Sequence, residues 1–244
     1  MAGDKQKMSE KGLLTPRNCV VAMIDLQPLM LVGVSDFDRQ SIINSNLLLA
    51  KAAKVFDIPV VVTTIEAKEF GGDLLPQVQA VYPDLRPIER TEISAWDNAA
   101  FVAAVKKSGR RNLVLAGLWT GTCIGLAALQ AAYDDYAVLV AEDCCGDVSR
   151  LAHDNAMKRM LRSAVAPVTA LSLMLEWQRD WAAEDTYDAV MDIVQTHCGA
   201  YGAAVEYVYT MVHGAPPRRL PAYEVPKAGV PMRIESARKK AVGA

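Results

Sequence analysis

The sequence has little histidine, with only three among 244 residues. His153, His197 and His213 are scattered, form no HxH, HxxxH or HExxH pattern, and leave the first 150 residues without any histidine. Hydrolytic zinc sites depend on such closely spaced histidines. We therefore expect no metal and no other cofactor.

Several signature motifs are also missing. No G-x-G-x-x-G follows the first expected strand and no P-loop occurs, so dinucleotide and ATP chemistry have no support. No G-x-S-x-G occurs either, which disfavours a serine–histidine hydrolase.

Cysteine usage and charge are unremarkable for an intracellular protein. The five cysteines are odd in number and two, Cys144 and Cys145, are adjacent, so they do not form a disulfide framework. The polar, charged start of the chain is not a secretory signal, and we expect a cytoplasmic protein. A formal net charge of −2 gives no indication of nucleic acid or acidic lipid as a partner.

One long stretch, from Asn112 to Tyr133, has no charged residue. A membrane helix needs about 20 predominantly apolar residues, whereas polar Thr120 and Thr122 and the small Gly121 interrupt this stretch. The pattern favours a strand, a turn and a helix, so we expect no membrane span.

Short β-branched runs alternate with longer helical patterns along most of the chain. The expected strands are Cys19–Ile24, Pro59–Thr64, Asn112–Ala116, Ala137–Ala141 and Val165–Leu171, and the expected helices lie near 40–56, 97–108, 122–133 and 150–163. Asp97 is the expected N-cap of the second helix. The pattern predicts a three-layer α/β/α sandwich, Rossmann-like, with a central mostly parallel sheet and a site at the carboxyl ends of its strands.

Four segments differ in composition. Residues 1–16 are polar, 17–185 form the α/β domain, 186–214 form a helical extension, and 215–244 form a Pro-rich basic arm. The extension is rich in Ala, Tyr and Val, so it either packs on the sandwich or joins subunits, and we favour a contact in a homo-oligomer. The arm has limited aromatic content, so a role in nucleic-acid binding is weakly supported.

Two residues next to expected strands are candidates for chemistry. Asp25 directly follows the first strand, where it is either a site carboxylate or a turn and N-cap residue. Cys123 opens the helix after the third long strand. The positive end of a helix dipole lowers a thiol pKa and favours a nucleophile, whereas most free cysteines are buried packing residues.

A positively charged residue that could pair with Asp25 or Cys123 lies between them in the sequence. Arg90 is placed to end a further strand, with Trp96 as a nearby aromatic wall. The alternative is that Arg90 forms a surface ion pair.

Together these segments resemble the isochorismatase-like cysteine hydrolase superfamily. The matching motifs are Asp25-Leu26-Gln27, the segment from Arg90 to Trp96, and Gly117-Leu-Trp-Thr-Gly-Thr-Cys123, and the similarity covers roughly residues 17–185. The SAWDN segment and the helical extension are most similar to the YcaC-type branch, whose members form ring-like or stacked oligomers. The resemblance thus implies a homo-oligomer, a tetramer or an octamer.

The resemblance also implies site residues. Its Asp–Lys–Cys triad corresponds to Asp25, Arg90 and Cys123, with arginine in place of the usual lysine. Arginine holds a permanent planar charge and cannot shuttle a proton, so proton transfer falls to Asp25. The implied oxyanion hole is formed by the backbone N–H groups of Trp119 and Cys123, with a cis peptide before Trp119.

The implied pocket residues are Gln27, Trp96 and Thr120. The function implied is a metal-independent cysteine hydrolase that cleaves a C–N bond of a small-molecule substrate through a thioester on Cys123. Two alternatives remain: a non-catalytic oligomeric protein that keeps the fold, and a vinyl ether hydrolase of the isochorismate type.

Overall fold

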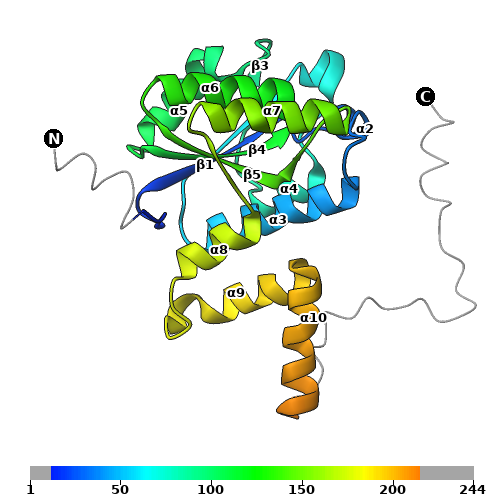
Figure 1. The fold of residues 1–244 in the computed structure, drawn as a ribbon, viewed down its shortest axis with the longest axis vertical. Coiled ribbons are helices and arrows are strands. Elements are labelled where there is room, and N and C mark those ends of the chain that lie inside the picture. The colour runs from blue at the N-terminus through cyan, green and yellow to red at the C-terminus, as the bar shows by residue number, and fades with distance from the viewer. Residues whose placement is uncertain (1–11, 215–244) are drawn as a thin grey trace, which may run out of the picture. The chain divides into compact units, whose positions relative to one another are not determined.

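A computed structural model describes residues 12–214. The arm 215–244 and most of the predicted N-terminal segment lie outside the described residues. Six parallel strands form one sheet in the order β3-β2-β1-β4-β5-β6 (Figure 1). The strands are β1 (Cys19–Ile24), β2 (Val60–Ile65), β3 (Ile88–Arg90), β4 (Asn112–Leu118), β5 (Ala137–Gly146) and β6 (Ala166–Val168).

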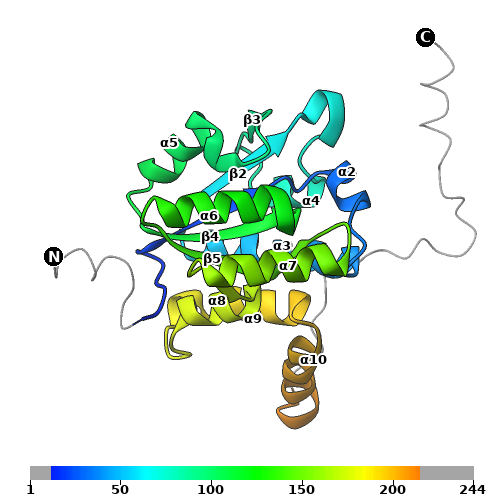
Figure 2. The ribbon, with the colours of Figure 1, turned by 45° about the horizontal axis from the view of Figure 1, so that its top comes forward.

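The centre of the sheet is apolar because helices cover both of its faces. Every residue of β1 and β4 is buried, as expected for continuous apolar strands in a parallel sheet. One face carries α5 (Ala99–Lys107), α6 (Gly125–Tyr133) and α7 (Arg150–Arg162), and the other carries α3 (Arg39–Val55) and α8 (Ala170–Gln178), as Figures 1 and 2 show. The predicted three-layer sandwich is confirmed.

The direction of strand addition reverses between β1 and β4. The chain passes from β1 outward to β2 and β3, then returns to β4 and continues outward to β5 and β6. At such a reversal the loops after the two central strands diverge, which opens a crevice at the carboxyl ends of the strands. The loop after β1 contains Asp25, and the turn after β4 contains Cys123.

Two local predictions are wrong. The expected strand Val165–Leu171 is shorter, because Thr169 caps α8 by accepting the N–H of Ser172. The N-cap of α5 is Asn98 rather than Asp97, since the Asn98 side chain accepts the N–H of Phe101.

Short elements complete the domain: α2 (Pro28–Val32), α4 (Pro76–Val81), the π-helical turns η1 (Ala67–Gly71) and η3 (Thr120–Ile124), and the 3₁₀ turn η2 (Ala95–Asp97). A further π-helical turn, η4 (Val208–Val212), lies after this domain. The uncharged stretch therefore folds as β4, η3 and α6. Within residues 12–214, no helix is long and apolar enough to span a bilayer.

The first C-terminal helix after the sandwich belongs to the same compact unit. Helix α9 (Glu184–His197) contacts α3 and buries its apolar face. The buried residues are Val190, Met191, Ile193 and Val194. This unit ends at Gly202, within α10 (Gly199–Tyr207), and a second unit begins at Ala203. The domain boundary at 185 and the subunit contact through 186–214 stay predictions.

Candidate active site

Asp25 lies directly after the carboxyl end of β1, next to the point where the strand order reverses. Its backbone turns sharply there, with φ at +53°, and its N–H donates to the carbonyl of Thr63 on β2 at 3.0 Å. The residue is completely buried. The side-chain oxygen Oδ1 lacks a hydrogen-bond partner of normal geometry among the described residues. Asp25 is therefore a buried carboxylate at the switch point rather than a solvated cap.

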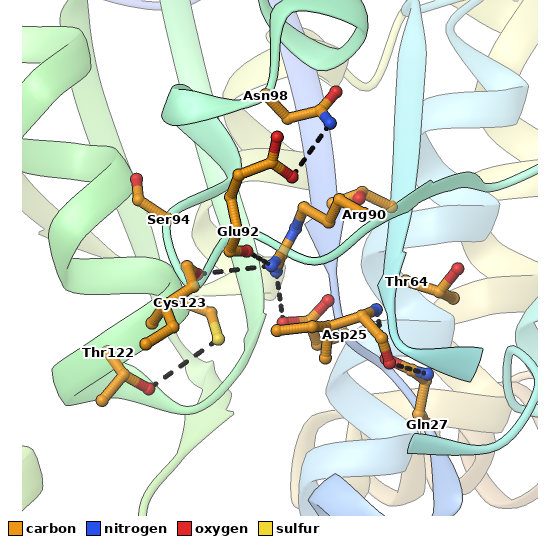
Figure 3. Close-up of polar contacts among 12 residues, drawn as sticks. Asp25, Gln27, Thr64, Arg90, Glu92, Ser94, Asn98, Thr122 and Cys123 are labelled. Carbon is orange, nitrogen blue, oxygen red and sulfur yellow. Dashed lines mark hydrogen bonds and ion pairs between the residues drawn. The ribbon is translucent and has the colours of Figure 1, made fainter. Parts of the chain in front are cut away.

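Arg90 ends β3 and pairs with Asp25 from the side. Its Nη2 contacts Asp25 Oδ2, and both side chains are fully buried (Figure 3). Its Nη1 donates to the carbonyls of Glu92 and, at 3.3 Å, of Ile93. The alternative of a surface ion pair is wrong, because a planar guanidinium is held here between a carboxylate and two main-chain carbonyls.

Cys123 is presented by a turn that departs sharply from the sheet. Gly117 has φ at +132°, and a Cβ there would overlap the carbonyl oxygen of Ile24, so only glycine fits between β4 and β1. The Leu118–Trp119 peptide is cis, as the resemblance implied. The Trp119 indole then donates to the carbonyl of Met30 at 2.7 Å, which ties the turn to α2.

Cys123 lies in a π-helical turn that leads directly into α6, rather than within that helix. The π-helical turn η3 contains Cys123, and α6 begins two residues later at Gly125. The thiol is nearly buried, faces the Asp25 carboxylate, and accepts a weak contact from Thr122 Oγ1 at 3.8 Å (Figure 3).

The pKa values of the two groups are both raised. Burial raises the pKa of Asp25 to about 6, although Arg90 and the contact with Cys123 act in the opposite direction. Burial, the Asp25 charge and the hydrogen bond to Asp25 raise the pKa of the Cys123 thiol to about 11, against smaller lowering effects of Arg90 and Thr122. At neutral pH the resting site therefore holds a carboxylate and a neutral thiol.

These pKa values correct one expectation. The expected lowering of the Cys123 pKa by the helix start is wrong, because burial and the neighbouring carboxylate outweigh the positive groups. The resting site therefore holds a neutral thiol rather than a preformed thiolate.

The three predicted pocket residues have other partners in the structure. The Gln27 amide donates to the carbonyls of Ile65 at 3.0 Å and Gly72 at 2.6 Å, and accepts the Ile65 N–H at 2.9 Å. It thus fastens the loop after β2 beside Asp25. The Thr120 hydroxyl lies 2.9 Å from His153 Nδ1, on the side of η3 that faces α7.

Trp96 lies away from the thiol. Its indole donates to Asp134 at 2.9 Å and packs edge-on against Tyr136 and Phe101. Asp134 follows the carboxyl end of α6, whereas Cys123 precedes the amino end of the same helix. The structure does not bring the Trp96 side chain to the triad, and substrate contact by any of the three pocket residues stays a prediction.

Sequence reasoning missed a second buried cluster behind η3. It consists of His153 on α7, Asp36 in the loop before α3, and Asp147 directly after β5. A lone histidine on a helix gives no motif, and the two aspartates lie far from it in sequence. Among residues 12–214, no group of three or more His, Cys, Asp or Glu side chains has the geometry of a metal site.

Residues 19–172 match the family profile described as the isochorismatase domain, which covers more than half of the sequence, so the chain belongs to the isochorismatase family. It is also 32% identical over 169 residues to the probable hydrolase YcaC of Escherichia coli strain K12, covering 69% of this chain and 81% of that relative. The chain is therefore a hydrolase of the YcaC branch of this family.

Two solved structures support the assignment of the chain to the YcaC branch. YcaC from Pseudomonas aeruginosa, solved with hexane-2,5-diol and a covalent acrylamide, superposes with a TM-score of 0.78 at 30% identity, covering 82% of this chain and 98% of the other. The Escherichia coli YcaC structure, described as an octameric hydrolase of unknown specificity, has the same TM-score at 29% identity and the same coverage.

Proposed function

We propose that this chain is a metal-independent cysteine hydrolase that cleaves the C–N bond of a small amide through a thioester on Cys123. The observation that carries the proposal is the buried contact of Asp25 with both Arg90 and the Cys123 thiol at the switch point of the sheet. A carboxylate beside a neutral thiol is the arrangement needed for general-base activation of a nucleophile.

The proposed acylation step uses Asp25 as the base. Asp25 takes the thiol proton while Cys123 Sγ forms a bond to the amide carbon, and the carbonyl electron pair moves onto oxygen. The backbone N–H groups of Trp119 and Cys123 are the proposed donors to that oxyanion. The carbonyl re-forms as the C–N bond breaks, and Asp25 gives its proton to the departing nitrogen.

Deacylation reverses these roles. Asp25 takes a proton from water, whose oxygen bonds to the thioester carbon, and the C–S bond then breaks. The sulfur regains a proton from Asp25, which restores the resting site. Arg90 cannot exchange protons in either step, so its role is to hold Asp25 in place and to stabilise its negative charge.

The pKa values explain why the proton transfer accompanies attack. With the pKa of Asp25 raised to about 6 and that of Cys123 to about 11, moving the proton alone from the thiol to the carboxylate is unfavourable, because burial of the thiolate opposes it even after Asp25 has become neutral. Forming the C–S bond at the same time removes the need for a free thiolate in the buried site.

The central experiment is trapping of the acyl group on Cys123. The protein is incubated with a panel of small amides and examined by intact-mass and peptide mass spectrometry. We expect an adduct on Cys123, and loss of turnover in Cys123→Ala. Cys198→Ala is the matched control, since Cys198 is a half-buried thiol whose pKa burial likewise raises to about 11.

The alternatives give different results in the same experiment. An active Cys123→Ala variant favours ether hydrolysis of the isochorismate type, which does not need the thiol. Absence of adduct and of turnover across the panel, with equal alkylation of Cys123 and Cys198, favours the non-catalytic protein.

We further propose that the protein is a homo-oligomer, a tetramer or an octamer, and acts in the cytoplasm. The support for assembly is the octamer described for the Escherichia coli relative. Light scattering coupled to size-exclusion chromatography tests it, and a monomer at micromolar concentration would contradict it.

A further inference from the structure

The turn that presents Cys123 is held from the side opposite Asp25. Cys123 at its end faces Asp25, whereas Thr120 and Gly121 at its start contact the loop after β5 and helix α7. The triad therefore fixes only one side of the turn.

Asp147 holds the main chain of the turn. Its side chain is almost completely buried, and Oδ2 accepts the N–H of Gly121 at 2.7 Å. A Cβ at Gly121 would lie 2.9 Å from that oxygen, so glycine permits this close approach. Oδ1 of the same carboxylate accepts the N–H of Val148 at 2.7 Å, which fixes the orientation of the carboxylate.

His153 holds the side chain of the turn. Its imidazole is fully buried, with Nδ1 2.9 Å from Thr120 Oγ1 and 3.4 Å from Asp36 Oδ2. Its Nε2 lies 3.3 Å from Glu142 Oε1, on a side chain that is partly exposed. Both ring nitrogens therefore have oxygen partners, which fixes the plane of the ring.

Asp36 connects these two supports. Its Oδ1 accepts the N–H groups of Asp147 and Phe37, each at 2.9 Å, while Oδ2 faces His153. The Phe37 ring packs edge-on against the imidazole, with the centroids 4.9 Å apart. The loop before α3, the end of β5 and helix α7 are thus joined at one buried point behind the turn.

We propose that His153, Asp36 and Asp147 are positioning residues of the hydrolase, which hold the Thr120–Cys123 turn so that the thiol faces Asp25. Among the described residues, none of the three forms a hydrogen bond or ion pair with Asp25, Arg90 or Cys123. Their effect on catalysis therefore passes through the turn. For turnover, this inference rests on the proposed function of Cys123.

The test compares His153→Leu with His153→Asn. Leucine removes both polar contacts, whereas asparagine places an amide group near the position of Nδ1 and can still bond Thr120. Displacing reacting atoms by about 1 Å costs on the order of a hundredfold in rate. We expect His153→Leu to lose roughly 10- to 100-fold in kcat with little change in KM, and His153→Asn to stay within about threefold of the wild type.

A second measurement does not depend on the substrate. Acrylamide adds to a thiol by forming a C–S bond at its β-carbon while the thiol proton moves to the α-carbon. Labelling of Cys123 relative to Cys198 in the same molecule is read by peptide mass spectrometry. We expect this ratio to fall roughly tenfold or more in His153→Leu and to be preserved in His153→Asn.

Controls separate positioning from unfolding. His197→Leu is the matched substitution, since His197 contacts Asn44 and Lys51 on α3; because His197 adjoins Cys198, the rate of Cys123 labelling itself is compared in this variant, and it should be unchanged. If His153→Leu fails to fold, Thr120→Val removes only the hydroxyl that His153 contacts and should lower the ratio in the same direction. Thermal melting confirms that each variant is folded.

Clear results would overturn the inference. A folded His153→Leu protein with a normal labelling ratio and normal kcat contradicts it, as does a shift in the acid limb of its pH profile, which would mean direct proton transfer. If the wild type shows no Cys123-dependent turnover, the proposed function fails, but the labelling ratio still decides whether His153 positions the turn.

Discussion

Removing the charge of Arg90 should disable the site by protonating Asp25. In Arg90→Met the Asp25 carboxylate keeps its burial but loses the positive partner that lowers its pKa. Two unit charges about 4 Å apart at an effective dielectric constant of about 20 interact by roughly 4 kcal/mol, or about three pKa units. Since the pKa of Asp25 is about 6 with Arg90 present, the variant carries a protonated Asp25 at pH 7.

A protonated Asp25 cannot accept the thiol proton. We expect kcat/KM of Arg90→Met to fall roughly a hundredfold at pH 7 and to recover in part as the pH rises. Arg90→Lys should stay within about tenfold, because lysine keeps the charge although it loses the planar fork that reaches two carbonyls. The assay is turnover with the best amide of the panel, measured from pH 5 to pH 9.

The same variant makes a prediction about stability. At pH 5 Asp25 is mostly protonated in both proteins, so the lower free energy of unfolding of Arg90→Met reflects lost packing and hydrogen bonds. At pH 8 only the wild type keeps Asp25 ionised, and the loss of unfolding free energy in Arg90→Met should be larger than at pH 5 by roughly 3 kcal/mol, because the wild type stops losing stability near pH 6 whereas the variant, with a pKa of Asp25 of about 9, goes on losing it up to pH 8. Urea unfolding at the two pH values measures it. The reasoning would be refuted if Arg90→Met lost the same free energy of unfolding at pH 5 and at pH 8. It would also be refuted if kcat/KM of this variant at pH 7 stayed within tenfold of the wild type.

Three further predictions, one on the wild type and two on variants, test other parts of the structure. The wild-type kcat/KM should rise with pH through an acid limb near 6, where Asp25 loses its proton, and a limb near 4 would mean that the base is a solvated carboxylate. Gly117→Ala should destabilise the protein by about 3 kcal/mol or more in urea unfolding, because its Cβ overlaps a β1 carbonyl, and a change below about 1 kcal/mol would contradict this packing. Gln27→Leu should cost roughly 2–4 kcal/mol in urea unfolding, since it leaves main-chain groups after β2 unpaired, and Gln27→Glu should cost at least as much, because a buried carboxylate oxygen would face the carbonyls of Ile65 and Gly72; a loss below about 1 kcal/mol in both variants would contradict this role.

Much of the fold follows from local sequence patterns. The runs at Cys19–Ile24 and Asn112–Ala116 are apolar almost throughout. Such runs are typical of strands that are buried on both faces of a parallel sheet. Where local signals compete, the prediction fails. At Val165–Leu171 the β-branched residues indicate a strand, but Thr169 is also a good N-cap, and the helix begins there.

The site was predictable to the extent that its residues follow strands. Asp25 directly follows an expected strand, Arg90 was expected to end a further strand, and Cys123 lies in the turn after the strand expected at Asn112–Ala116; parallel strands bring such ends to one edge. The direction of the side chains was not predictable in the same way. Trp96 belongs to a matching motif, yet its indole packs toward the far end of α6, because Asp134 and Tyr136 provide its partners there.

The sequence by itself determined the parallel α/β sandwich and the places of its apolar strands along the chain, and with its resemblance to a known family it pointed to Asp25, Arg90 and Cys123. Periodicity and strand-end position are local properties, so the chain carries them without reference to its packing. Only the tertiary structure decided the protonation of the site and the support behind it. The pKa of Cys123 depends on burial and on a carboxylate 98 residues away, and the cluster of Asp36, Asp147 and His153 forms because three separate segments meet behind one turn.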